Sequence, residues 1–213
     1  MKSVIFGVFL LLLFKLPIIL AHKNMCYSCD ATNSEICKHK EKECPEGSEC
    51  MTISEEFVSL GQSCHSISKR CALNLPSNKT FYAYVGLDVS VKLSYQSCKG
   101  ELCNTGFFQM PNISTQAKGI VCPACFAFNS TGGCNATGTT ICLGEDDQCI
   151  RFRGTMKLPC GGEADFSAQG CSSKTVCEYS HSEMIGLRIT KQLENKCYLP
   201  TASPSSNIKP PQN

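Results

Sequence analysis

Tryptophan is absent from this chain of 213 residues, and the sequence also lacks any block of basic residues. Without such a block, the chain offers no electrostatic footprint for nucleic acid or for an anionic membrane surface. The formal charge of +2 includes Lys2 and Lys15, and without these two the 18 remaining basic side chains face 18 acidic ones. We therefore expect a nearly neutral mature protein and no nucleic-acid partner.

Recognisable catalytic motifs are also missing. The sequence has no Gly-x-Ser-x-Gly nucleophile elbow and no glycine loop that could cradle a phosphate. Glu145, Asp146 and Asp147 lack the other ligands of a calcium loop and are typical of a solvated turn. The four histidines are scattered, without a His-Glu-x-x-His pair for zinc: His22, His39, His65 and His181. We expect no enzyme activity, no cofactor and no metal site.

Only one long apolar run occurs, and it lies at the start of the chain. Residues 1–21 combine Lys2, an apolar stretch and the small residue Ala21, as a secretory signal peptide does. Lys15 and Pro17 end the run after about a dozen residues, fewer than the roughly 20 that cross a bilayer, so a signal anchor is the weaker alternative. Residues 200–213 are polar and disordered by composition, without the hydrophobic tail of a lipid-anchor signal. We expect secretion to the extracellular space and no membrane anchor.

Cysteine is the abundant residue, with 18 copies. Cys26, Cys29, Cys37, Cys44 and Cys50 are separated by 2, 7, 6 and 5 residues. A second set follows with separations of 2, 8, 7 and 6, namely Cys122, Cys125, Cys134, Cys142 and Cys149. In a secreted chain this repeat predicts a disulfide framework. Each disulfide would stabilise its small unit by about 3 kcal/mol.

The repeat divides the chain into two units. We expect a first domain at residues 22–106, a linker at 107–119 and a second domain at 120–199. Cys122-Pro123-Ala124-Cys125 matches the Cys-x-x-Cys motif of a thioredoxin redox pair. It occupies the repeat position of Cys26 and Cys29, however, and lacks a βαβ context. We therefore interpret it as structural.

Alternating apolar residues predict strands. Residues 51–64 have the pattern of a hairpin, and Val89, Val91, Leu93 and Tyr95 share one face of a strand that pairs with residues 80–85, with a tip near Gly86 and Leu87. In the second unit residues 150–158 alternate in the same way before a turn at Gly161 and Gly162, and residues 184–189 supply a further strand. Residues 33–43 are predicted to form a solvated loop. No segment has a long helical period, so we expect an all-β fold.

The closing Cys98-x4-Cys103-Asn104, taken with the repeat, resembles the three-finger domains of the urokinase-receptor and lymphocyte-antigen family over nearly all of residues 25–199. The resemblance implies tandem three-finger, snake-toxin-like domains, most similar to gamma-type secreted phospholipase inhibitors and their soluble mammalian relatives. It also implies that Asn104 ties the closing ring to the base of the domain. The pairs implied are Cys26 with Cys50, Cys29 with Cys37, Cys44 with Cys64, Cys98 with Cys103, Cys122 with Cys149, Cys125 with Cys134, Cys142 with Cys171 and Cys177 with Cys197.

Cys71 and Cys160 are left over by that pattern, because Ser97 stands where a partner for Cys71 is expected. We hypothesise a bridge between Cys71 and Cys160 that joins the two domains. The alternatives are an intermolecular disulfide and two free thiols.

Four Asn-x-Ser/Thr sequons predict glycosylation in loops or the linker, at Asn78, Asn112, Asn129 and Asn135. Phe81, Tyr82 and Tyr84 form a possible recognition surface for a protein. The alternative is that these rings fill the small core.

The expected function is the binding of an extracellular protein. The resemblance implies inhibition of a secreted phospholipase by covering its active-site face. The alternative is a soluble ligand or decoy for a cell-surface receptor.

Overall fold

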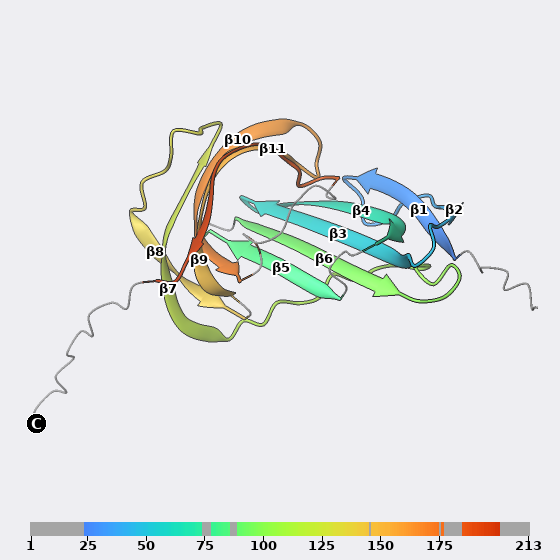
Figure 1. Ribbon diagram of the computed structural model, residues 1–213. Coiled ribbons are helices and arrows are strands. Elements are labelled where there is room, and N and C mark those ends of the chain that lie inside the picture. Colours follow the sequence, from blue (N-terminus) through green and yellow to red (C-terminus); the bar gives the residue numbers. More distant parts are fainter. Residues whose placement is uncertain are drawn as a thin grey trace, which may run out of the picture.

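The computed structural model describes residues 24–73, 78–85, 89–144, 146–174, 176 and 185–200. Every regular element in these ranges is a β-strand (Figure 1), which confirms the all-β prediction. Within them, no helix has the length and apolar character that crossing a membrane requires. The predicted signal peptide, the tail from residue 201, the hairpin tip at Gly86 and Leu87, and the acidic side chains of residues 145–147 lie outside the described part.

The first domain contains six strands: β1 (Met25–Thr32), β2 (Lys40–Glu43), β3 (Glu49–Ser59), β4 (Gln62–Ala72), β5 (Lys79–Tyr84) and β6 (Ser90–Cys98). The predicted hairpin is present as β3 and β4, whose pairing runs from Glu49 opposite Ala72 to Ser59 opposite Gln62. Leu60 and Gly61 form its turn with φ of 51° and 79°, the positive values that a tight two-residue turn needs. The segment predicted as a solvated loop contains β2, whose four exposed residues pair with β1.

The second domain contains five strands: β7 (Ala117–Phe128), β8 (Gly138–Leu143), β9 (Asp146–Lys157), β10 (Glu163–Ser173) and β11 (Ile189–Tyr198). Ile150 and Phe152 are buried while Arg151 between them is exposed, as the alternation predicts. The strand predicted at residues 184–189 is wrong in position, because β11 starts only at Ile189. Residues 185–187 instead turn their backbone N–H groups toward a carboxylate of the first domain. β7 starts at Ala117, inside the predicted linker.

One sheet runs through both domains in the order β11-β9-β10-β5-β6-β3-β4-β1-β2, with β7 paired to β10 and β8. In Figure 1 the strands of the second domain curl around one end of the flatter first domain. β10 joins β5 through Cys171 opposite Tyr84 and Ser172 opposite Ala83. A single apolar core likewise contains residues of both domains, and the rings of Phe57 and Phe166 meet with centroids 6.0 Å apart.

Six of the implied disulfides are present in the structure: Cys26 with Cys50, Cys29 with Cys37, Cys98 with Cys103, Cys122 with Cys149, Cys125 with Cys134 and Cys142 with Cys171. Cys197 is also disulfide-bonded, and Cys177, its expected partner, lies outside the described residues. No described cysteine is free.

The expected pair of Cys44 with Cys64 is wrong, because Cys44 is bonded to Cys71. On β4, Cys64 lies opposite Phe57 near the hairpin tip, whereas Cys71 lies opposite Cys50 at the base. The two positions are seven residues apart along the strand, or about 24 Å at roughly 3.4 Å per residue. Since a disulfide joins Cα atoms no more than about 6.8 Å apart, Cys44 at the base reaches only Cys71.

The hypothesised bridge between the domains exists, but with a different partner in the first domain. Cys160 is bonded to Cys64, with a Cα–Cα distance of 5.1 Å and a sequence separation of 96 residues. The Cys71–Cys160 pair is therefore wrong. Cys64 is available for this bridge because the hairpin carries it away from the base of its own domain.

Asn104 occupies the position expected for it at the base of the first domain. Its side chain is 4% exposed, its Oδ1 accepts from the Tyr27 N–H at 2.9 Å, and its Nδ2 donates to the carbonyl oxygens of Tyr27 (2.9 Å) and Met51 (3.2 Å). The amide thus links the closing ring to β1 and β3.

Candidate functional site at the junction of the two domains

A buried carboxylate of the first domain accepts hydrogen bonds from a loop of the second. Glu55 on β3 is fully buried, and its Oε2 accepts hydrogen bonds from the Ser66 hydroxyl (2.7 Å) and from the N–H groups of Gly186 (2.8 Å) and Leu187 (2.7 Å). Its Oε1 accepts from the Ile185 N–H at 2.8 Å. Successive backbone N–H groups that converge in this way form an anion-binding nest. The nest of the second domain is therefore filled by an acid of the first.

Gly186 is the residue that lets the loop approach so closely. A Cβ atom at this position would lie 2.7 Å from Glu55 Oε2 and would overlap the Ser66 hydroxyl. Leu187, next in the chain, is fully buried in the common apolar core. The loop is thus held by its three N–H hydrogen bonds to Glu55, which we call the Glu55 clamp, and by the burial of Leu187.

Two residues along β4 from Ser66, the Cys64–Cys160 disulfide forms a covalent link between the domains. Beside it, the Asn33 N–H donates to the carbonyl oxygen of Pro159 at 2.6 Å, and Pro159 is itself fully buried. Together with the β5–β10 pairing and the Glu55 clamp, this gives three separate attachments. The two domains are therefore joined by a disulfide, by strand pairing and by buried hydrogen bonds.

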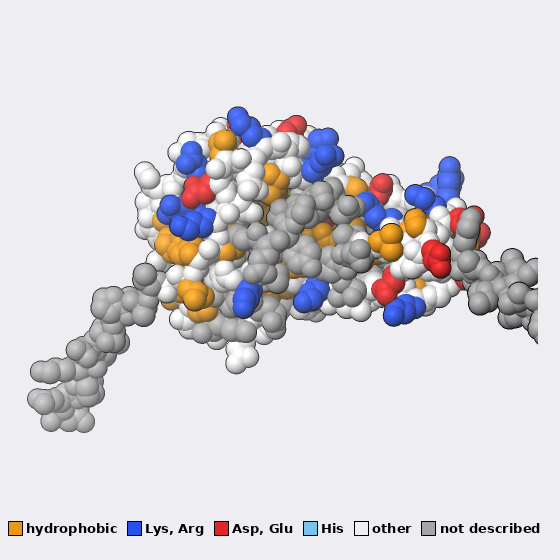
Figure 2. All heavy atoms as spheres, viewed as in Figure 1, with side chains coloured by type: hydrophobic (Ala, Val, Ile, Leu, Met, Phe, Trp, Pro, Cys, Tyr) orange, Lys and Arg blue, Asp and Glu red, His pale blue; other side chains and the backbone are white. Residues whose placement is uncertain are grey.

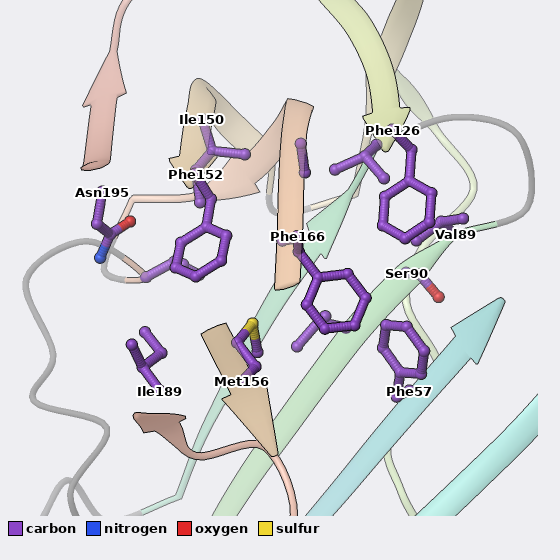
Figure 3. Close-up of a pocket in the computed structure, with 15 residues that line it drawn as sticks. Phe57, Val89, Ser90, Phe126, Ile150, Phe152, Met156, Phe166, Ile189 and Asn195 are labelled. Carbon is purple, nitrogen blue, oxygen red and sulfur yellow. The ribbon is translucent and has the colours of Figure 1, made fainter. Parts of the chain in front are cut away.

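An apolar cavity of about 100 Å³, which we call the junction pocket, lies between the domains. Figure 3 shows the side chains around it, with Phe57 and Val89 from the first domain facing Phe126 and Phe166 from the second. Phe152, Met156 and Ile189 line its other end. The polar side chains among its lining residues are Ser90 and Asn195. Such a site suits an apolar group and offers little to a charged one.

The recognition surface predicted on β5 is not a free edge. β5 pairs with β6 on one side and with β10 on the other, so it is an interior strand of the sheet. Phe81 is 3% exposed and packs edge-on against Tyr95, as the alternative of a core role expects. Tyr82 and Tyr84 are half-buried. The prediction of a free surface failed because β5 pairs with β10 of the second domain, and the sequence of the first domain does not reveal this pairing.

The cysteine clusters do not fit a metal. The sulfur atoms of Cys26, Cys44 and Cys71 lie close together, as do those of Cys122, Cys142 and Cys171, but all six belong to disulfides. A disulfide sulfur is not the thiolate that zinc or redox exchange requires. The predicted structural role of the Cys122 and Cys125 pair agrees with this, because each is bonded to a different cysteine.

A polar cluster surrounds His65 on the β3–β4 hairpin. Its Nε2 lies 2.9 Å from the Ser63 hydroxyl, 3.6 Å from Glu35 and 3.9 Å from Glu56. In a catalytic triad the carboxylate and the serine bind opposite ring nitrogens of the histidine, whereas here both lie beside Nε2.

Lys69, also on β4, is 4% exposed and donates to the Gly106 carbonyl at 2.7 Å. Its burial lowers the pKa of its ammonium group.

All four predicted glycosylation sites are exposed: Asn78, Asn112, Asn129 and Asn135.

Basic and acidic side chains are interspersed on the face in Figure 2, as expected from the balanced composition. His22 and His181 lie outside the described residues, whereas His39 packs against Tyr27 with ring centroids 4.1 Å apart.

Comparison with known proteins gives two matches to one family model, described as the u-PAR/Ly-6 domain, at residues 22–106 and 118–201. The chain is 27% identical over 110 residues to Protein RoBo-1 of Rattus norvegicus, covering 50% of this chain and 42% of that protein. It is 28% identical over 149 residues to the phospholipase A2 inhibitor 31 kDa subunit of Naja kaouthia, covering 65% of this chain and 77% of the subunit. The crystal structure of mouse TEX101 aligns with a TM-score of 0.36 and 18% identity, covering 84% of this chain and 99% of that one.

Proposed function

Because the chain belongs to the u-PAR/Ly-6 domain family, we propose that it is a secreted glycoprotein that binds another extracellular protein and inhibits a secreted phospholipase. The similarity to the phospholipase A2 inhibitor subunit of Naja kaouthia supports the choice of target. The junction pocket is the observation that carries the proposal, because it is a binding feature built by both domains together.

An enzyme that works on membrane lipids presents apolar side chains to the bilayer surface. A side chain of that kind can enter the junction pocket between Phe126, Phe166 and Met156. Burying a Leu- or Phe-sized side chain contributes about 1.5–3 kcal/mol. Anchors of this type, seated in a preformed pocket, supply much of the affinity of protein interfaces. Occupation of the enzyme's lipid-facing surface would keep it from its substrate.

The proposal is tested by measuring hydrolysis of phospholipid vesicles by a panel of secreted phospholipases, with the purified full-length chain added at micromolar concentration. We expect dose-dependent inhibition of at least one enzyme. Met156→Gln places an amide in the pocket at similar length and should weaken inhibition about tenfold, equivalent to roughly 1.4 kcal/mol. Lys157→Gln, on the exposed neighbouring position of β9, is the matched control and should inhibit normally.

No inhibition of any enzyme in the panel would contradict the proposal. Saturable binding of the same preparation to cells, without inhibition, would instead favour the soluble receptor ligand or decoy.

A further inference from the structure

A second hollow lies on the face of β9 opposite the junction pocket, and we call it the second-domain pocket. It is an open depression of about 590 Å³, within the range of about 300–1,000 Å³ usual for small-molecule sites. Arg151 and Arg153 of β9 form its floor together with Gln169 of β10, and Glu194 of β11 lies along one side. Residues 133–136 form the opposite wall.

That wall is fixed to the sheet by side-chain hydrogen bonds. The Ser167 hydroxyl accepts from the Gly133 N–H (3.1 Å) and donates to the Ser130 carbonyl (2.8 Å). Gln169 Nε2 donates to the Cys134 carbonyl at 3.0 Å, and Cys134 is bonded to Cys125. The pocket is therefore preformed, and a ligand entering it would not have to order the loop.

The two arginines supply hydrogen-bond donors to the pocket. Each guanidinium lies 3.8 Å from a Glu194 oxygen, which is an ion pair but not a hydrogen bond. Arg153 Nε donates to the Thr131 carbonyl at 2.9 Å, and Arg151 has only a long contact of 3.4 Å with Gln169 Oε1. A guanidinium carries five N–H donors, so several have no close acceptor among the described residues. The site is suited to a ligand rich in neutral oxygen acceptors.

Asn135 is itself part of the pocket lining, is exposed, and opens the sequon Asn135-Ala136-Thr137. Any sugar attached to its side chain would begin at this pocket. Asn129 has a sequon in the same loop and is also exposed, but it does not line the pocket.

We propose that the second-domain pocket binds the first N-acetylglucosamine units of an N-glycan carried by Asn135. Arg151 and Arg153 donate hydrogen bonds to the hydroxyl and acetamide oxygens, and Pro123 and Ala136 contact the C–H faces of the sugar rings. The covalent tether gives a local sugar concentration of about millimolar or more, so weak contacts are enough to hold the glycan. The bound glycan then covers the outer face of β9 and leaves the junction pocket to the partner protein.

The test uses the full-length protein secreted from mammalian cells, incubated without denaturant with peptide N-glycosidase F. Release at each site is followed over time by mass spectrometry of the deamidated peptides. We expect release at Asn135 to be about tenfold slower than at Asn129, a ratio equivalent to roughly 1.4 kcal/mol. After denaturation and reduction the two rates should be equal.

Arg151→Ala should accelerate release at Asn135 without changing release at Asn129. Lys157→Ala, at an exposed position of the same strand outside the pocket lining, is the matched control and should change neither rate. If the thermal midpoint shows that Arg151→Ala is misfolded, Arg151→Gln replaces it. The proposal is overturned by an unmodified Asn135, by equal native release at Asn135 and Asn129, or by equal rates in the arginine and lysine variants.

Discussion

Glu55 is the residue on which the contact between the domains most depends. It is a fully buried acid in a strand whose neighbours Ser54 and Glu56 are also polar, so the local sequence resembles a solvent-exposed edge. Its carboxylate is stabilised by four donors, three of them backbone N–H groups some 130 residues away in the chain. Hydrogen bonds to a charged group contribute about 1.5–3 kcal/mol each when both partners are buried.

We predict that Glu55→Gln lowers stability by about 2 kcal/mol or more, because an amide NH₂ replaces one of the two carboxylate oxygens and leaves at least one N–H group of the nest without an acceptor. For a chain of this size the thermal midpoint should fall by about 4–8 °C. The measurement is a thermal melt under nonreducing conditions.

Glu49→Gln is the control, since Glu49 lies on the same strand but pairs at 3.5 Å with Lys99, whose side chain is 86% exposed. Such a surface pair contributes at most about 1 kcal/mol. Equal midpoints for the two variants would show that the Glu55 clamp does not stabilise the protein.

At the level of single residues, sequence reasoning succeeded where the closing motif was local and failed where the partner was distant. Asn104 was placed correctly because it follows the closing cysteine. Glu55 and Gly186 were missed because no spacing rule connects an acid on one hairpin with a loop in another domain. The one available signal was the glycine directly before Leu187. Since glycine occurs in loops for many reasons, it did not indicate a close contact with Glu55.

Among the elements, β5 and β10 determine how the two domains become one sheet. Gly170 on β10 is the point of closest approach, because a Cβ atom there would overlap the Tyr84 carbonyl oxygen and the Cα of Val85. These are backbone atoms that cannot rotate away. Next to this contact, the Tyr82 N–H donates to the Ser173 hydroxyl at 3.1 Å.

Gly170→Ala should therefore separate β5 from β10, at a cost of about 1–3 kcal/mol as for other overpacked sites. We expect faster amide hydrogen exchange in β5 and at residues 171–173, while the β3–β4 hairpin keeps its protection. Gly138→Ala is the matched control, because nothing lies within 4 Å of a Cβ atom at this position of β8. Unchanged exchange in β5 would contradict the prediction.

The disulfide arrangement could have been predicted more fully from the repeat itself. Cys142 and Cys171 are separated by 29 residues, close to the 27 between Cys44 and Cys71, whereas Cys44 and Cys64 are only 20 apart in the numbering. Comparing the two units would have assigned Cys71 to its own domain. Cys64 would then have been the unpaired residue, and with Cys160 the bridge between the domains.

For the whole molecule, the three attachments predict that the linker is not needed to hold the domains together. A protease site inserted between the exposed residues Pro111 and Asn112 allows the chain to be cut there. The cut protein should migrate as one species in nonreducing denaturing electrophoresis and as two after reduction, because the Cys64–Cys160 disulfide connects the halves.

A double variant, Cys64→Ser with Cys160→Ser, separates the covalent link from the rest. After cutting, its halves should part under denaturing conditions yet elute together in native gel filtration, held by the common core and the β5–β10 pairing. Separation of the native halves would mean that the disulfide alone joins them.

The junction pocket itself could not be predicted from the sequence. Phe57 and Phe152 were expected only to lie in strands of separate domains, and nothing was predicted for Phe166. Their meeting depends on the relative placement of two domains, which is fixed by contacts far apart in the chain. The fold class followed from local spacing, and the candidate site from long-range geometry.

The bridge between Cys64 and Cys160 also constrains the order of events during synthesis. Synthesis proceeds at about 5–20 residues per second, so Cys160 follows Cys64 by roughly 5–20 s. During this time the partner of Cys64 has not yet been made, while the partners of the other first-domain cysteines are already present. A thiol left waiting in an oxidising lumen is open to wrong partners. Of the disulfides that contain a first-domain cysteine, this one would be the last to form, because its partner is synthesised after all the others. A mispaired Cys64 would then be a substrate for the cell's disulfide isomerases.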